Sequence, residues 1–510
     1  MSLLPQDDLF SNQPSISSLL NQLRRSTLTP HNRLKSIRAD AEFVAQVASA
    51  FSTNPRDSES GRRKRRRRPL VANERCGSWY IQPEKKDGSA YFKSTDGHER
   101  AWKFSTRRLN LHLIDVIEQN DGIIIVDSTR RGKRMPDALS TTIPIWCTVL
   151  NLALLPNHPL SSKLFLPPYL PASTHSQITA LMPSFLSSLK ELNLTLPTSL
   201  TKPLRPLWIT QESSLPIPTD SDDDAESSTP NDEEDQGVIF QDYRPIICCT
   251  ASRRVIGSEV DEGGYIQGAG DDTENWAMGL TPDVFWANTT ALLSAPEAAL
   301  PDLIAQLVEE AKVQRRSASS GDGTQSALPR KQLTPCISVR PISPLDLSSP
   351  QTKRQDECLI LLTENTTPKD SWIQSPTHIR VGLGKHKTAS RNLRLALAEI
   401  CSFAALFLEK HDSVTSTPNT SSDSPPSNSQ PPQIIVACDS GKDLSVGVAL
   451  ALSCYLFDEQ GRFRVPDEKA SFTKTLVKIR LGTIMTVYPE ANPSRATLQS
   501  VNSFLMDWRK

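Results

Sequence analysis

The chain has 510 residues, 37% of them hydrophobic and 22% charged, which is enough for two or three domains with packed cores. Net charge is zero, and the nine cysteines form no Cys-x-x-Cys pair, which argues against a zinc site or a disulfide framework and fits a reducing compartment. The sequence has no secretory signal and no apolar stretch of about 18 residues, so we expect a soluble intracellular protein without a membrane partner.

Residues 1–70 are expected to form a helical and basic extension. Within 16–51, an apolar stripe at helical spacing predicts a helix that docks by one face, formed by Leu34, Ile37, Ala41, Val44 and Val47. Arg62 to Arg68 are seven consecutive basic residues, a block that repels itself and is expected to stay disordered. A nuclear address, a non-specific RNA tether and a solvated linker remain open for it. We therefore expect a cytoplasmic protein, with the nucleus as the alternative.

Residues 71–312 are expected to form an N-terminal domain of α/β or α+β type. Helical spacing marks residues 109–118, and Ile123 to Val126 read as a strand buried on both faces, as in a parallel sheet. An acidic linker is expected at 213–237, followed by a strand at 246–250.

A linker at 313–330 is expected to lead into a C-terminal α/β domain at 331–510, with a disordered insertion at 411–432. The sequence after this insertion predicts a strand at 433–437, a polar loop at 438–445 and a helix at 446–457. Strand, loop and helix in that order build phosphate sites in α/β folds.

A basic loop follows the predicted strand that ends before Asp127. Open α/β sheets bind ligands at such strand ends, and arginine and lysine side chains suit phosphate groups. We interpret the loop as an anion site, with a solvated basic loop as the alternative. Its candidate phosphate ligands are Ser128, Thr129, Arg130, Arg131, Lys133 and Arg134.

Basic residues alternate with aromatic residues between positions 93 and 108, a pattern that suits a nucleic-acid surface. Lys93, Arg107 and Arg108 are the candidate RNA contacts. His98 and His112 are candidate general bases, although a lone histidine is more often structural.

Glycines precede two acids in the segment from Gln267 to Asp272. Glycine lets backbone approach a ligand closely, and Asp271 with Asp272 would suit Mg²⁺ on a pyrophosphate. An ordinary acidic turn is the alternative.

The loop from Cys438 to Ser445 starts like a protein-tyrosine-phosphatase loop, but Leu444 stands where such a loop has its arginine. Without that side chain a phosphoryl transition state lacks its clamp, so phosphate binding is favoured over phosphatase catalysis. A strand–helix connection without a ligand is the remaining alternative. The candidate binding residues are Cys438, Ser440, Gly441, Lys442 and Ser445.

Taken together, these segments resemble the fungal and plant initiator tRNA phosphoribosyltransferases. The resemblance covers most of the chain that is expected to be ordered. It rests on residues 78–80, 90–98, 104–112, 126–139, 265–272, 276, 279–282, 285–286, 438–446 and 491–495.

The resemblance implies transfer of a 5-phosphoribosyl unit from phosphoribosyl pyrophosphate to the 2'-hydroxyl of a T-stem adenosine in initiator methionine tRNA, which keeps that tRNA out of elongation. It also implies a family-specific N-terminal domain and a C-terminal domain similar to dual-specificity phosphatases. Such a reaction needs a proton acceptor, for which Asp127, His98, His112 and Asp96 are candidates, and positive charge for the departing pyrophosphate. Mg²⁺ is an expected cofactor, and DNA is not an expected partner.

Two other functions remain open from the sequence. One is an RNA or nucleotide phosphatase that uses the C-terminal domain, against which Leu444 speaks. The other is a non-catalytic tRNA-binding protein, which would ignore phosphoribosyl pyrophosphate.

Overall fold

The computed structural model describes residues 27–52, 67–93, 101–216, 240–317, 330–343, 346, 356–415, 432–458, 460–467 and 470–507. Asp96, His98, residues 62–66 and most of the three expected linker segments lie outside these ranges. Contacts divide the chain into two compact units.

The division is more interleaved than the sequence indicates. The first unit comprises residues 1–104, 114–182 and 198–311, and the second comprises 105–113, 183–197 and 312–510. The chain therefore passes between the units five times. The first unit also includes the helix that we expected in a separate extension.

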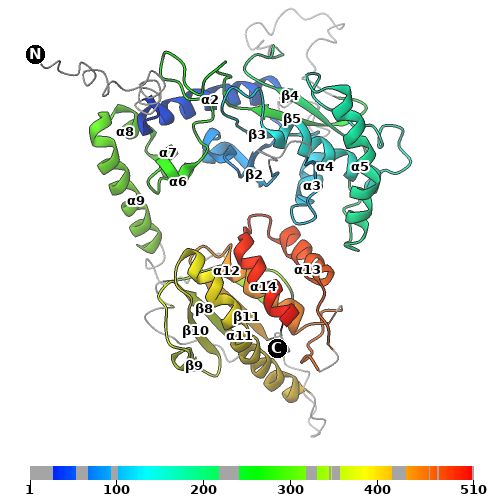
Figure 1. The fold of residues 1–510 in the computed structure, drawn as a ribbon, viewed down its shortest axis with the longest axis vertical. Coiled ribbons are helices and arrows are strands. Elements are labelled where there is room, and N and C mark those ends of the chain that lie inside the picture. The colour runs from blue at the N-terminus through cyan, green and yellow to red at the C-terminus, as the bar shows by residue number, and fades with distance from the viewer. Residues whose placement is uncertain are drawn as a thin grey trace, which may run out of the picture. The chain divides into compact units, whose positions relative to one another are not determined.

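A five-stranded sheet forms the centre of the first unit, in the order β2-β1-β3-β5-β4, with every neighbouring pair parallel (Figure 1). The predicted strand at 123–126 is the middle strand, and all of its side chains are buried, so the parallel-sheet prediction is confirmed. The strands are β1 (Leu70–Asn73), β2 (Lys86–Ala90), β3 (Ile123–Asp127), β4 (Leu204–Ile209) and β5 (Arg244–Thr250).

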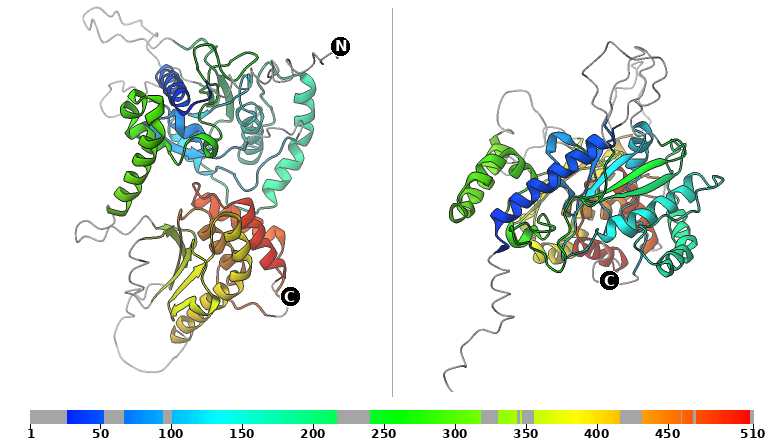
Figure 2. Two further views of the ribbon diagram at one scale, coloured as in Figure 1. Left: turned by 60° about the vertical axis from the view of Figure 1, so that its left-hand side comes forward. Right: turned by 90° about the horizontal axis from the view of Figure 1, so that it is seen from above.

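Helices cover both faces of this sheet (Figure 2). Helix α2 packs on the face that presents Leu70, Ile124 and Ile247, whereas α4 packs beside β4 and brings Cys147 near Cys248 on the other face. The helices are α2 (Pro30–Ala50), α3 (His112–Gln119), α4 (Ile143–Leu154), α5 (Ala172–Lys190), α6 (Thr273–Trp276), α7 (Pro282–Ala287), α8 (Thr289–Ser294) and α9 (Leu300–Ser317), with short helices η1 (Gly77–Tyr80), η2 (Pro83–Lys85), η3 (Ala138–Thr142) and η4 (Glu297–Ala299).

Helix α2 confirms the predicted docking helix. Thr29 caps its first turn by accepting a hydrogen bond from the Asn32 N–H at 3.3 Å, and Pro30 suits the first helical position. All five residues of the predicted stripe are buried, and most of them join the core of the first unit.

The end of the basic block differs from the prediction. Arg68 is fully buried, with its guanidinium paired to Asp121 at 2.6 Å and donating to the Phe51 carbonyl at 2.7 Å. The sequence could not show this, because the partners of Arg68 lie 17 and 53 positions away.

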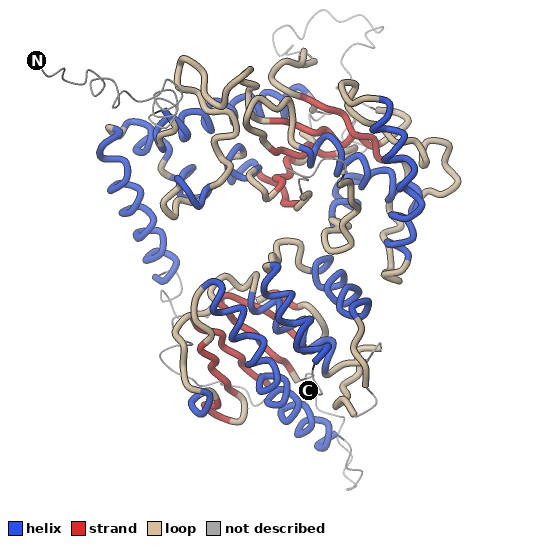
Figure 3. Tube along the Cα trace, in the orientation of Figure 1, coloured by secondary structure: helices blue, strands red, loops and turns tan. Residues whose placement is uncertain are grey.

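The second unit contains a six-stranded sheet in the order β6-β7-β11-β8-β10-β9, with parallel central strands and antiparallel edges. Its helices pack together over one face (Figure 3). The elements are β6 (Lys331–Gln332), β7 (Ile337–Pro341), β8 (Glu357–Thr363), η5 (Lys369–Ser371), β9 (Ile373–Ser375), β10 (His378–Gly382), α11 (His386–Thr415), β11 (Gln433–Cys438), α12 (Leu444–Tyr455), α13 (Lys474–Val487) and α14 (Arg495–Asp507).

The predicted strand–loop–helix segment is confirmed as β11, its loop and α12. Helix α12 is buried on nearly every side, and α14 approaches it closely at Gly447, where an added Cβ would lie 2.4 Å from a Thr497 methyl carbon. Among the helices of the described ranges, none has both the length and the apolar character needed to cross a membrane.

Candidate functional site

The carboxyl ends of the parallel strands form a polar edge in the first unit. The chain runs from β1 to β2 on one side and then returns to β3 on the other, so the connections diverge between β1 and β3. Ligands of open α/β sheets bind at such switch points. Asn73 ends β1 here, and Asp127 ends β3.

Asp127 organises this edge from a fully buried position. Its carboxylate accepts hydrogen bonds from the Asn73 amide at 2.8 Å, the Ser128 N–H at 2.8 Å and the Cys76 thiol at 3.1 Å. A general base must reach the proton that it removes. Asp127 has no exposed surface and organises the groups around it, while its role as a base stays a prediction.

Arg75 links Asp127 to Asp271. Its guanidinium lies 3.3 Å from a carboxylate oxygen of each and donates to the Ser128 carbonyl. Burial lowers the pKa of Arg75, but the surrounding acidic groups outweigh burial and leave that pKa above its ordinary value. Burial raises the pKa of Asp271, and Arg75 opposes this rise without cancelling it.

Sequence reasoning missed Asn73, Arg75 and Cys76 altogether. Asn73 ends a four-residue strand that has no strong periodicity, and Arg75 and Cys76 follow it; their partners at Asp127 and Asp271 lie 51 to 196 positions away. Of the three, only Arg75 is partly exposed, at 20% of its side chain, so it is the member that a bound anion would reach.

The basic loop that follows β3 has acidic side chains of the same unit beside several of its cations. Arg130 pairs with Asp272, Lys133 lies 3.7 Å from Asp137, and Arg134 lies 3.8 Å from Glu212. The sequence suggested that a bound anion compensates the charge of this loop, whereas the structure places acids beside these three residues. Exposed ion pairs of this kind are weak, so phosphate groups can displace the acids.

Two other members of the loop behave differently. Arg131 is exposed in a left-handed conformation (φ +57°) and lines a cavity of about 310 Å³ beside residues 257–260. Ser128 and Thr129 are buried, and the Thr129 backbone exchanges hydrogen bonds with the Ser252 hydroxyl at 3.2 and 2.9 Å. Their hydroxyls are therefore less accessible than the sequence indicated.

Gln267 holds the basic loop in place. Its amide oxygen accepts from the Gly132 N–H at 3.0 Å, and its amide nitrogen donates to the Lys133 carbonyl at 2.8 Å. At Gly268 (φ +71°) an added Cβ would lie 2.7 Å from the Thr129 carbonyl oxygen. The glycine thus allows two loops to pack closely, where we had expected an approach to a ligand.

The tentative magnesium site does not match the structure. Asp271 pairs with Arg75 and Asp272 pairs with Arg130, so the two carboxylates serve different arginines. Within the described ranges, no cluster of three or more His, Cys, Asp or Glu side chains could hold a metal. These residues therefore do not fit a protein-held Mg²⁺.

The loop after β11 is closely packed. Cys438 is buried, and its thiol donates to the Ser445 hydroxyl at 3.1 Å. Gly441 has φ +66°, and an added Cβ would lie 2.7 Å from the Pro341 nitrogen. The loop therefore packs tightly against the end of β7.

Two polar side chains of this loop bind elsewhere in the second unit. Lys442 lies 3.0 Å from Glu490, and Asp443 accepts hydrogen bonds from the Ser494 N–H at 2.8 Å and the Thr497 hydroxyl at 2.7 Å. The loop itself has no arginine, and Leu444 begins α12. The loop thus lacks the clamp of a phosphatase, as the sequence indicated.

The candidate RNA contacts lie in both units. Lys93 is an exposed residue of the first unit, whereas Arg107 and Arg108 belong to segment 105–113 of the second. Arg107 is exposed. Arg108 donates to the Ala491 carbonyl at 2.8 Å and to the Asn492 side chain at 2.6 Å, so its guanidinium serves the protein itself.

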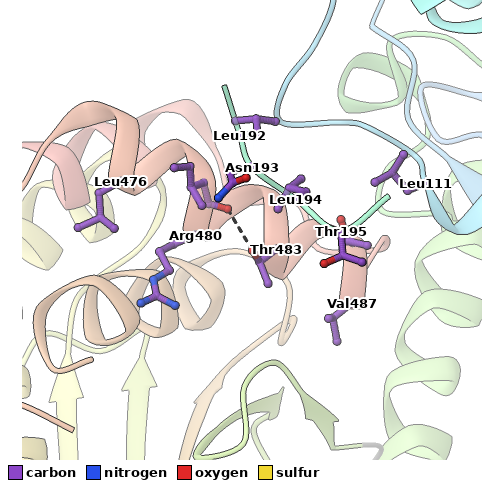
Figure 4. A pocket seen from close by; sticks show the side chains of 11 residues that line it. Leu111, Leu192, Asn193, Leu194, Thr195, Leu476, Arg480, Thr483 and Val487 are labelled. Carbon is purple, nitrogen blue, oxygen red and sulfur yellow. Dashed lines mark hydrogen bonds between the residues drawn. The ribbon is translucent and has the colours of Figure 1, made fainter. Parts of the chain in front are cut away.

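His112 begins α3 and is half-buried in the second unit. That unit also contains a cavity of about 480 Å³ between α13 and residues 192–195 (Figure 4). Leu111, Arg480 and Thr483 line it, together with other residues of those segments. None of the predicted site residues contributes to this cavity.

Comparisons with known proteins cover nearly the whole chain. The model of the Rit1 N-terminal domain matches residues 23–309, and that of the Rit1 DUSP-like domain matches residues 377–505. An uncharacterized protein of Schizosaccharomyces pombe is 33% identical over 96% of both chains. The tRNA A64-2'-O-ribosylphosphate transferase of Saccharomyces cerevisiae is 32% identical over 96% of this chain and 95% of its own length.

Among solved structures, the Cydia pomonella PTP-2 phosphatase is 10% identical and covers 35% of this chain and 90% of its own, with a TM-score of 0.22. Human DUSP28 is 13% identical and covers 36% of this chain and 97% of its own, also with a TM-score of 0.22. The description of the second family model agrees with the phosphatase-like C-terminal domain predicted from the sequence. With family models matching both units and relatives aligned along almost all of its length, the chain belongs to the Rit1 family.

Proposed function

We propose that this chain transfers a 5-phosphoribosyl group from phosphoribosyl pyrophosphate to the 2'-hydroxyl of a T-stem adenosine in initiator methionine tRNA. The observation that carries the proposal is its alignment, at 32% identity over 96% of its length, with a protein named as a tRNA A64-2'-O-ribosylphosphate transferase. The first unit supports it by placing a basic loop at the switch point of a parallel sheet.

The reaction joins the 2'-oxygen of the tRNA to C1' of the donor. The bond between C1' and the pyrophosphate oxygen breaks, pyrophosphate leaves with the bonding electrons, and the hydroxyl proton passes to a base. A-form RNA exposes its 2'-hydroxyls in a wide, shallow minor groove, so the acceptor can be reached without flipping a base.

The basic loop would stabilise the departing pyrophosphate. Charge that develops in a transition state is stabilised most by donors that are already in place. Gln267 fixes the backbone of this loop at Gly132 and Lys133, while Arg130, Arg131 and Lys133 supply the cations. Asp127 and Arg75 hold the underlying edge in shape.

The proton acceptor remains open among Asp96, His98, His112 and Asp127, of which Asp127 is buried and already accepts three hydrogen bonds. The phosphatase alternative is weaker, since Leu444 leaves the loop after β11 without its clamp. A generic aryl phosphate tests that alternative directly.

The test uses the full-length protein, donor labelled in its 5'-phosphate, Mg²⁺, and initiator and elongator methionine tRNAs. We expect label to enter initiator tRNA only. Alanine at Arg130, Arg131 and Lys133 should abolish transfer by weakening donor binding. The proposal fails if the wild-type protein binds tRNA but transfers no label. The assignment of the loop fails if the triple variant keeps its donor affinity and turnover.

A further inference from the structure

A row of alternating cations and aromatic rings lies on the first unit and includes none of the residues predicted to bind RNA. The Lys163 ammonium lies 5.1 Å from the centre of the Phe165 ring. The Arg205 guanidinium lies 4.8 Å from the Phe165 ring and 4.6 Å from the Tyr243 ring. We call Lys163, Phe165, Arg205 and Tyr243 the edge row.

The edge row runs beside the last strand of the sheet. Arg205 belongs to β4, which pairs only with β5 and is therefore an edge strand, and Tyr243 directly precedes β5. The row thus lies at the amino end of β4, the strand labelled in Figure 1.

The carboxyl end of β4 leads to the basic loop. The Trp208 indole N–H of β4 donates a hydrogen bond to the Leu139 carbonyl at 2.9 Å. The Tyr169 hydroxyl is hydrogen-bonded to the side chain of Ser140, the residue after Leu139. The Arg134 guanidinium lies 5.7 Å from the Tyr169 ring. Arg205 and Trp208 are three residues apart, about 10 Å along a strand. Side chains three positions apart on a strand point to opposite faces, so the edge row and the loop assigned to the donor are joined to the same strand from opposite faces of the sheet.

The two cations of the edge row differ from those of the basic loop in their partners. Arg130, Lys133 and Arg134 each have a carboxylate beside them. In the part of the chain that the structure describes, neither Lys163 nor Arg205 has one. An aromatic face attracts a cation without neutralising it. Both charges thus stay available to an outside anion.

We propose that the edge row binds the phosphate backbone of the acceptor RNA at the amino end of β4, where the RNA continues beyond the reaction site. The inference rests on the proposed function, because the 2'-hydroxyl must reach the polar edge of the same sheet. A stem placed there extends past the donor loop, and the edge at β4 offers it the two cations Lys163 and Arg205.

The row should contribute affinity without sequence preference. The rings of Phe165 and Tyr243 already face the cations of the row, so they are poorly placed to stack on bases. Contacts to phosphates position an RNA but do not read its sequence. Loss of the row should therefore weaken initiator and elongator tRNA binding to the same extent.

The test measures binding of unmodified tRNA between 50 and 200 mM salt. Each phosphate contact contributes about 0.9 to the slope of log affinity against log salt on a duplex. The Lys163→Gln/Arg205→Gln variant should lose about 1.8 from that slope, so its affinity loss across this range should be about twelvefold smaller than that of the wild type. The KM for the donor should not change.

Three further variants separate charge from structure. Lys163→Gln, at an exposed side chain, should lower the slope by about 0.9 without affecting folding. Arg205→Lys should keep the slope, which a purely packing role of the guanidinium would not predict. Arg38→Gln is the matched control, because Arg38 lies 5.9 Å from the Trp286 ring but pairs with Glu42.

An unchanged slope in Lys163→Gln and in the double variant overturns the inference while label transfer by the wild type still supports the proposed function. A slope loss for one tRNA only would also overturn it, because it would assign sequence reading to the row. Absence of label transfer by the wild type would instead refute the proposed function. The salt dependence of tRNA binding would still test whether the edge row binds RNA.

Discussion

Replacement of Arg75 by methionine should show how the polar edge of the first unit is held together. In the wild type, this guanidinium lies between Asp127, which is fully buried, and Asp271, which is 7% exposed. Methionine keeps much of the volume of arginine but leaves both carboxylates without a cation. Removing one partner of a buried ion pair costs about 3–5 kcal/mol, and the 20% exposure of Arg75 places the expected loss near 3 kcal/mol at pH 7.

The loss should depend on pH with a definite sign. Without Arg75 the folded cluster holds a proton more tightly than the unfolded chain does, so stability falls as pH rises. As pH is lowered, the loss of stability caused by Arg75→Met should shrink by about 1.4 kcal/mol per pH unit, wherever the folded variant binds one more proton than the unfolded chain. Most of the 3 kcal/mol should therefore disappear between neutral pH and pH 4.5.

Hydrogen exchange in peptides from β1 and β3 measures this locally, which suits a chain of two units. Arg67→Met is the matched control, since Arg67 pairs with Asp87 at 2.9 Å with both side chains exposed, and should lose at most about 1 kcal/mol. A loss for Arg75→Met that is the same at pH 7 and pH 4.5 would refute the reasoning, because it would reflect packing alone.

Three other predictions concern single acids and the cysteine loop. Asp272→Asn should tighten donor binding about two- to fivefold in calorimetry, because phosphate no longer displaces an exposed carboxylate from Arg130; weaker binding would contradict this. Burial raises the pKa of Glu118, but hydrogen bonds from Arg244 and Thr201 outweigh it and lower that pKa to about 2. Glu118→Gln should therefore cost about 1–2 kcal/mol at pH 7 after screening by solvent, and the wild-type advantage should fade from pH 4.5 toward pH 2 in denaturant unfolding; an advantage that persists at pH 2 would argue against it. Cys438→Ser should retain most label transfer, since the thiol is buried against Ser445; complete loss in a folded variant would point to a thiolate nucleophile.

The residue pattern of a single segment was sufficient to predict its secondary structure and which of its side chains are buried. Four β-branched residues from Ile123 to Val126 predicted a strand covered on both faces, and β3 is buried throughout. The segment around Cys438 predicted a strand, a loop and a helix for the same reason. The stripe on α2 predicted a docking face, although not that the helix belongs to the first unit.

The roles of the candidate site residues depend on partners that are distant in the sequence. Asp127 has the chemistry of a base, but its burial depends on Asn73, 54 positions away, and on Arg75. The sequence suggested that Asp271 and Asp272 form a magnesium pair. In the structure, Asp271 pairs with Arg75, 196 positions away, and Asp272 pairs with Arg130, 142 positions away. Residue type reveals what a side chain can do, whereas contacts across the fold determine whether it is free to do it.

The interleaved division of the chain bears on how it folds during synthesis. Residues 105–113 and 183–197 belong to the second unit, whose helix α13 ends at residue 487, nearly 300 positions after the later of the two segments. At about 5–20 residues per second, these segments wait roughly 15 to 75 seconds for that helix. A fragment that begins at residue 312 would lack both of them. Two parts of the second unit are therefore synthesised between segments of the first unit, long before the rest of their own unit exists.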